Sequence, residues 1–164
     1  MRVAVRDVNT GALGSASEFI EVPRLRPGHI ALSSIILASG KSVMDEKTNA
    51  EQENGKARTD VAAVRSFRQG ESIVYLYQVL NAHKDKERQT AVEAQVSLFR
   101  NGDAIFTTTP EPPKTDHTST PERLLCGGAL HLGQKMPPGD YVLLVAVRDG
   151  RNTRVTRAID FEVK

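Results

Sequence analysis

The sequence is poor in cysteine, in aromatic residues and in net charge. It contains one cysteine, no tryptophan and only 5% aromatic residues, so an internal disulfide is excluded and a broad stacking platform is not expected. Lysine and arginine exceed aspartate and glutamate by 22 to 20, and the formal charge of +2 gives no field that would concentrate nucleic acid at the surface. We therefore expect no nucleic-acid partner.

Long apolar runs and a recognisable leader are also missing. No stretch approaches the roughly 20 apolar residues that span a bilayer, so membrane insertion of this segment is not expected. The first residues, MRVAVRDVNTG, alternate like a strand and lack the basic and then apolar layout of a signal peptide. We expect this N-terminus to lie inside a longer protein, with any export signal upstream.

Short alternating segments rich in Val, Ile, Leu, Phe and Tyr are separated by turn residues, and no long window keeps a helical apolar stripe. The pattern predicts an all-β chain, namely an immunoglobulin-like or fibronectin III-like antiparallel β-sandwich with an extra N-terminal β-hairpin. We expect strands near residues 2–7, 16–22, 29–38, 72–81, 91–100, 104–109, 123–132, 141–148 and 154–163.

Two segments at opposite ends of the chain resemble one another. The letters VAVRD at residues 3–7 return at residues 145–149, and each copy is followed by a turn and a strand ending in Glu-Val. We interpret both as the closing hairpin of successive sandwich domains, with chance similarity between two hairpins as the alternative. Residues 1–23 would then be the closing strands of a preceding domain, and residues 24–164 an immunoglobulin-like domain.

An isolated two-stranded hairpin is only marginally stable in water, so residues 1–22 should pack against another part of the protein or another chain. We expect them to pack on the main domain or to be exchanged in a homodimer.

Residues 39–60 are almost entirely polar and are expected to form a long mobile loop, or alternatively a binding lid that orders on contact. Residues 108–121, rich in proline and threonine, are expected to cross between the two sheets.

Asn101-Gly102 and Tyr141 give the sharpest local predictions. The Asn-Gly pair tolerates the positive φ values of a type I′ turn, and the flanking Arg100 and Asp103 would face one another across the hairpin. Tyr141 opens a strand at the place of a tyrosine corner, whose hydroxyl bonds to backbone upstream. An ordinary half-buried strand tyrosine is the alternative.

Several phrases of the sequence are similar to a known family. Residues 14–23 (GSASEFIEVP), residues 64–67 (VRSF) leading to residues 78–82 (QVLNA), and residues 137–141 (PPGDY) together resemble the C-terminal region of acidobacterial von Willebrand factor A-related (VWFA-related) domain proteins. The resemblance covers most of the chain except residues 39–60. It implies an exported bacterial protein, periplasmic or at the cell surface, in which this piece follows an adhesion-type domain. The metal signature of that domain, Asp-x-Ser-x-Ser, does not occur here, so its metal-dependent binding is not carried over.

Cys126 and His131 are the only cysteine and histidine that lie close together in the sequence. Their odd separation on one strand puts them on opposite faces, unless Gly127-Gly128 forms a bulge. Cys126 shares its face with three leucines and is expected to be a buried small hydrophobic residue, with a ligand or nucleophile as the alternative. His131 is then a surface residue.

The other candidates for chemistry are scattered over connections. Three histidines lack the spacing of a zinc site, and Asp116-His117 with Ser119 lacks a nucleophile elbow. The carboxylates that could work as an acid and base pair fall in the polar loop rather than on rigid strands. These histidines and carboxylates are His29, His83, His117, Asp45, Glu46, Glu51 and Glu53. We therefore predict no catalytic, cofactor-binding or metal-binding residues.

The expected function follows from this shortage of chemistry. We expect a non-catalytic interaction or spacer module of a larger exported bacterial surface protein, which presents sheet edges or loops to a protein or glycan partner and contacts neighbouring domains of the same polypeptide. The alternatives are an enzyme with an unrecognised site near residues 39–60 and a purely structural linker that positions an adhesion-type domain. The fold does not choose among them.

Overall fold

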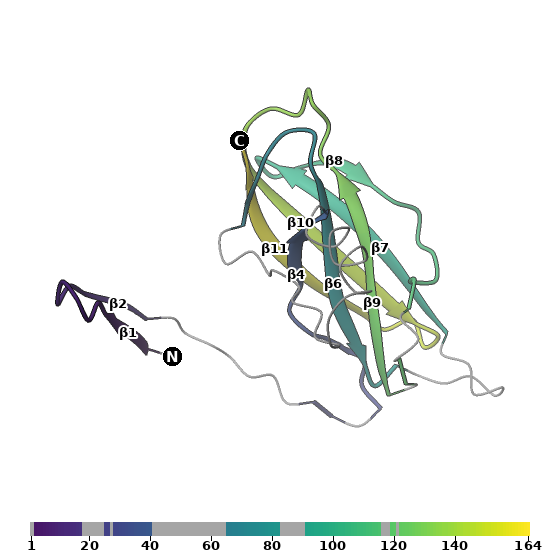
Figure 1. Ribbon diagram of the computed structural model, residues 1–164. Coiled ribbons are helices and arrows are strands. Elements are labelled where there is room, and N and C mark those ends of the chain that lie inside the picture. The colour runs from purple at the N-terminus through teal and green to yellow at the C-terminus, as the bar shows by residue number, and fades with distance from the viewer. Residues whose placement is uncertain are drawn as a thin grey trace, which may run out of the picture.

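The computed structural model describes residues 2–17, 25–26, 28–40, 65–82, 91–115, 119–120 and 122–164. Its named elements are strands, arranged in one two-stranded, one five-stranded and one four-stranded sheet (Figure 1). The all-β prediction is confirmed. The loop predicted over residues 39–60 lies outside the described residues, apart from Ser39 and Gly40.

The five-stranded sheet contains the longest strands. In spatial order it consists of β5 (Ser66–Phe67), β11 (Arg154–Val163), β10 (Gly139–Asp149), β7 (Val92–Arg100) and β8 (Asp103–Thr107). Neighbours are antiparallel, except that β5 pairs parallel with β11. Because β10 has a strand on each side, it lies at the centre of the sheet, as its long apolar run predicts.

The four-stranded sheet is centred on β6 (Ser72–Leu80). One edge of β6 pairs with β9 (Arg123–His131) along its whole length, and the other pairs with β3 (Ala31–Leu32) and β4 (Ile36–Ser39). The single strand predicted over residues 29–38 is therefore two strands. At the break, the Gln78 amide donates to the Ser33 hydroxyl at 2.9 Å instead of to a backbone carbonyl, and this interrupts the ladder.

Both sheets contribute to one hydrophobic core. In Figure 1, β6 and β9 cross in front of β7, β10 and β11. The buried side chains of the two sheets form one hydrophobic cluster. In β7 buried side chains alternate with more exposed ones from Val92 to Val96, and Ser97 breaks the alternation because it is buried where the Thr107 hydroxyl donates to it at 3.1 Å. The core residues include Leu32, Leu37, Ile73, Tyr77, Val79, Leu124 and Cys126 of one sheet and Val92, Val96, Leu98, Tyr141, Leu143, Val145, Val147 and Phe161 of the other.

The segment after β8 crosses between the sheets, as predicted. Glu111 pairs with Ala94 of β7, and Thr115 pairs with Cys126 of β9. The short strand β5 was not predicted, because two residues in parallel pairing leave no alternation to recognise.

The Asn101-Gly102 turn has the predicted geometry, with φ of 53° and 90°. Arg100 and Asp103 are paired in register, but the Arg100 side chain turns elsewhere. Its guanidinium lies 5.6 Å from the centroid of the Tyr141 ring and donates to the Pro138 carbonyl at 3.0 Å. An aromatic face together with a carbonyl holds this cation better than a solvated carboxylate does.

Tyr141 is fully buried, which is against the half-buried alternative. Its hydroxyl donates to the Pro137 carbonyl, four residues upstream, and this confirms the predicted bond to upstream backbone. The Tyr141 ring stacks on Phe161 of the neighbouring strand at a centroid distance of 5.7 Å. One side chain thus joins the turn before β10, the end of β7 and the end of β11.

The N-terminal hairpin consists of β1 (Arg2–Arg6) and β2 (Leu13–Ser17), so the second strand begins earlier than the predicted residue 16. Figure 1 shows the hairpin apart from the two larger sheets. Every side chain of β1 is exposed, as are the described side chains of β2. The expected packing of this hairpin on the main domain is therefore not present in residues 2–17, and residues 18–24 lie outside the described part.

Candidate functional site

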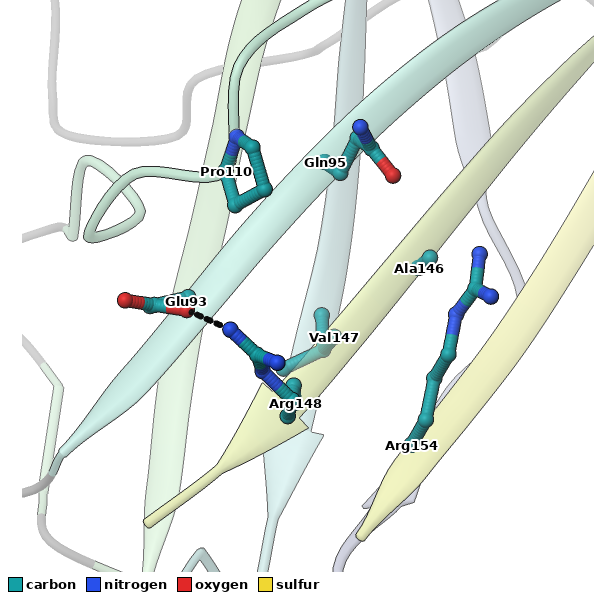
Figure 2. A pocket seen from close by; sticks show the side chains of 7 residues that line it. All are labelled: Glu93, Gln95, Pro110, Ala146, Val147, Arg148 and Arg154. Atoms are coloured by element: carbon teal, nitrogen blue, oxygen red, sulfur yellow. Dashed lines mark hydrogen bonds and ion pairs between the residues drawn. The ribbon is translucent and has the colours of Figure 1, made fainter. Parts of the chain in front are cut away.

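A shallow hollow of about 180 Å³ lies on the five-stranded sheet, on the face turned away from the core (Figure 2). In Figure 2 the Glu93 and Arg148 side chains point toward one another from β7 and β10, and Arg154 reaches in from β11. The hollow contains neither a histidine nor a hydroxyl or thiol nucleophile. Its lining consists of Glu93, Gln95, Pro110, Ala146, Val147, Arg148 and Arg154.

The charges in the hollow are largely solvated. Arg148 Nη2 lies 2.7 Å from Glu93 Oε2, and the two side chains are 50% and 47% exposed. An exposed ion pair of this kind contributes at most about 1 kcal/mol to stability. Gln95 donates to the Thr108 carbonyl at 3.0 Å, which fixes the connection after β8 against the sheet. The arrangement suits contact with a polar group of a partner better than proton transfer.

The second candidate surface is the edge strand β8. All five of its residues are exposed, and two of them are large and apolar: Ile105 is 51% exposed and Phe106 47% exposed. Within the described residues β8 pairs only with β7, and the register shifts between Leu98 and Phe99. The outer edge of β8 therefore offers backbone donors and acceptors beside apolar side chains, which is the composition of a strand-addition site.

Cys126 and His131 lie where the sequence predicts. The register from Cys126 opposite Tyr77 to His131 opposite Ser72 is continuous, so no bulge resets the alternation and the two side chains lie on opposite faces of β9. Cys126 is 1% exposed, and burial raises the pKa of its thiol to about 11. His131 is exposed, with Nδ1 3.2 Å from the Ser72 hydroxyl.

Cys126 is expected to resist alkylation while the protein is folded. A thiolate is the reacting species, and a pKa of about 11 leaves only on the order of 0.1% of it at pH 8. Iodoacetamide labelling followed by mass spectrometry should be at least about 100-fold faster in concentrated urea than in buffer. Labelling of the folded protein at the rate of a free cysteine would contradict the buried role.

The remaining predicted candidates are not brought together in the described residues. The Ser119 hydroxyl accepts the Leu125 amide at 2.9 Å, so it holds the start of β9. His29 is exposed at the turn before β3. The following candidates lie outside the described residues: His83, His117, Asp116, Asp45, Glu46, Glu51 and Glu53.

Within the described ranges, no group of three or more His, Cys, Asp or Glu side chains is placed to hold a metal ion. The same residues include no helix that is long and apolar enough to cross a membrane.

Sequence reasoning missed the Glu93–Arg148 pair and the hollow around it. Glu93 and Arg148 are far apart in the sequence and meet only because β7 is the neighbour of β10. The residues of the two strands do not show that β7 and β10 will be neighbours in the sheet.

No protein-family model and no curated protein matches the chain. Among solved structures, the chain is similar to a family 123 glycoside hydrolase from Clostridium perfringens, described in connection with glycolipid glycan hydrolysis. The identity is 12% and the TM-score 0.39, and the match covers 83% of this chain and 27% of that one. This chain therefore spans less than a third of the hydrolase, and so low a score carries no argument about its activity.

Proposed function

We propose that the chain is a non-catalytic interaction or spacer module of a larger exported bacterial surface protein, and that it binds an extended segment of a protein partner along β8. The proposal includes an immunoglobulin-like or fibronectin III-like antiparallel β-sandwich as the scaffold. The exposed apolar edge of β8 is the observation on which the proposal rests. The export and the surface location come from the family resemblance alone.

Two structural features support the scaffold. The five-stranded and four-stranded sheets share one core, and the connection after β8 passes from one sheet to the other. The hydroxyl of the buried Tyr141 holds the turn before the central strand, as a tyrosine corner does.

The composition of β8 supports a binding role. Soluble proteins usually protect an edge strand with lysine, proline, a β-bulge or a covering segment, because a bare edge pairs with other chains. The pairing of β8 with β7 has one such irregularity, the register shift between Leu98 and Phe99. The sequence of β8, DAIFT, has one charged residue, Asp103, and neither lysine nor proline. Ile105 and Phe106 would give the apolar contacts that select a partner, while the backbone gives the hydrogen bonds.

The chemistry of Cys126 supports a non-catalytic role. It is the only cysteine of the sequence, and burial both hides it from a substrate and raises its pKa to about 11. A nucleophilic cysteine needs the opposite conditions, namely access and a lowered pKa.

Peptide selection tests the β8 edge directly. A displayed library of short linear peptides would be panned on the purified chain, and binding of the selected synthetic peptides would be measured by calorimetry. We expect selected peptides to alternate apolar residues and to shift the NMR amide signals of residues 103–107. The double variant Ile105→Lys and Phe106→Lys should weaken their binding at least tenfold, which is about 1.4 kcal/mol.

Val142→Lys is the matched control. Val142 is also an exposed apolar strand residue, at 37%, but β10 is paired on both edges and has no room for an added strand. This variant should bind the peptides as the unmodified chain does. Equal loss in both variants, or peptides that bind elsewhere, would refute the β8 site. If a glycan array bound the chain and an Arg154→Ala variant did not, the partner would be a glycan at the hollow instead.

A further inference from the structure

The two hairpins that share the letters VAVRD have similar hydrogen bonds, although the first loop (residues 7–12) is one residue longer than the second (residues 149–153). The Asp7 amide donates to the Ala12 carbonyl at 2.9 Å, and the Asp149 amide donates to the Thr153 carbonyl at 3.1 Å. In each loop the aspartate Oδ1 accepts two backbone N–H groups at 2.8–3.1 Å. In the first loop these N–H groups, of Thr10 and Asn9, lower the pKa of Asp7.

The loops also turn back at the same place. Gly11 and Asn152 each lie two residues before the returning strand, each has a left-handed φ (72° and 64°), and each donates its N–H to the aspartate carbonyl. The register then continues alike, since Val5 is opposite Gly14 and Val147 is opposite Val155. The hairpin of β1 and β2 therefore resembles the hairpin of β10 and β11 in its aspartate hydrogen bonds, its left-handed residue and its strand register.

The surroundings of the two hairpins differ. Val145 and Val147 are 0% exposed, whereas their counterparts Val3 and Val5 are 47% and 66% exposed. The second edge of β10 pairs with β7, while in the described residues β1 pairs only with β2. The hairpin of β1 and β2 has the same form as a closing hairpin but lacks the sheet and the core that cover one.

We infer that β1 and β2 close a second sandwich unit whose other strands come from the same polypeptide, N-terminal to residue 1. β1 would pair antiparallel with a strand equivalent to β7, and Val3 and Val5 would be buried in that unit's core. Because Glu93 lies opposite Arg148, we expect the missing strand to place a carboxylate opposite Arg6. In the strand that pairs with β1, we expect an acidic, an apolar, a polar and an apolar residue in succession, as in residues 93–96 of β7.

A second copy of this chain fits the hairpin less well. Its strand β7 already pairs with β10 on one edge and with β8 on the other, so the β7 of a second copy cannot pair with β1. The inference rests on the proposed function only in that the chain is part of a larger polypeptide. It does not use the β8 edge.

Hydrogen exchange of the full-length polypeptide, compared with residues 1–164 alone, tests the inference. We expect the β1 amides to exchange at least about 100-fold more slowly in the full-length protein, while the β10 amides are protected in both. In the full-length protein, Val5→Asp and Arg6→Glu should each speed exchange in β1 and leave β10 unchanged. Val8→Asp, in the loop at 96% exposure, is the matched control and should change neither.

Equal β1 exchange in the two proteins would overturn the inference. Light scattering that gave a dimer of residues 1–164, lost on Val5→Asp, would assign the hairpin to a second copy instead. The variants Ile105→Lys and Phe106→Lys should leave β1 exchange unchanged. A failure of the β8 proposal is thereby separated from a failure of this one.

Discussion

Tyr141→Ala is expected to lower the free energy of unfolding by about 3–5 kcal/mol, the cost of removing a fully buried aromatic ring. The ring stacks on Phe161 and lies beneath the Arg100 guanidinium, so its loss leaves a cavity where β7, β10 and β11 meet. Urea denaturation followed by circular dichroism measures the change. Tyr141→Phe keeps the ring and removes only the bond to Pro137, so it should cost about 1–2 kcal/mol.

Phe106→Ala is the matched aromatic control for Tyr141. Because Phe106 is 47% exposed at the sheet edge, its removal should change the stability of the isolated chain by less than about 1 kcal/mol. Equal losses for Tyr141→Ala and Phe106→Ala would show that Tyr141 does not hold the core as described.

Gly127→Ala is expected to have the second-largest effect. A Cβ at this position would lie 2.6 Å from the Tyr75 backbone carbonyl oxygen and 2.7 Å from a methyl carbon of Leu76, where β9 pairs with the central strand of its sheet. Backbone cannot swing aside as a side chain can, so the two strands must separate locally. We expect a loss of about 1–3 kcal/mol in the same denaturation experiment.

Gly133→Ala provides the control for Gly127. It lies just beyond β9, and a Cβ there would meet nothing within 4 Å, so its stability should stay within about 0.5 kcal/mol of the unmodified chain. Gly128 is intermediate, because the atom in the way belongs to the Tyr75 ring, which can move. If Gly127→Ala and Gly133→Ala behaved alike, the close approach of β9 to β6 would be wrong.

The two proposals assign different surfaces to different neighbours. The β8 edge would take an extended segment of a partner, and the hairpin of β1 and β2 would complete a unit upstream in the same polypeptide. A protein built in this way would be a string of similar units, each closed by its own last hairpin. A purely structural linker would use the hairpin and leave the β8 edge without a ligand.

Local patterns predicted the strands well where one face of the strand is exposed to solvent. In β7, alternation of apolar and polar residues from Val92 to Leu98 gave both the strand and its buried face, because successive side chains of a strand point to opposite sides. The Asn101-Gly102 turn could also be predicted, since few residue pairs accept two positive φ values. The buried state of Cys126 followed from the same alternation.

Pairings between distant segments could not be predicted. The parallel contact of β5 with β11 involves two residues and leaves no pattern in either strand. The direction taken by Arg100 was mispredicted for a related reason, because Tyr141 and the Pro138 carbonyl come within reach only after β10 is laid beside β7. The hollow at Glu93 and Arg148 depends on the same strand order.

Local patterns along the chain were enough to predict the class of the fold, the position of most strands, the sharp turn and the repeated hairpin, because each of these depends on neighbours within a few residues. The folded structure was needed to find the order of the strands, the exposed edge at β8 and the exposure of Val3 and Val5. These depend on which backbone edges find partners, and backbone donors and acceptors are the same in every strand. The two hairpins therefore have similar sequences, while the burial of each hairpin depends on the sheet beside it.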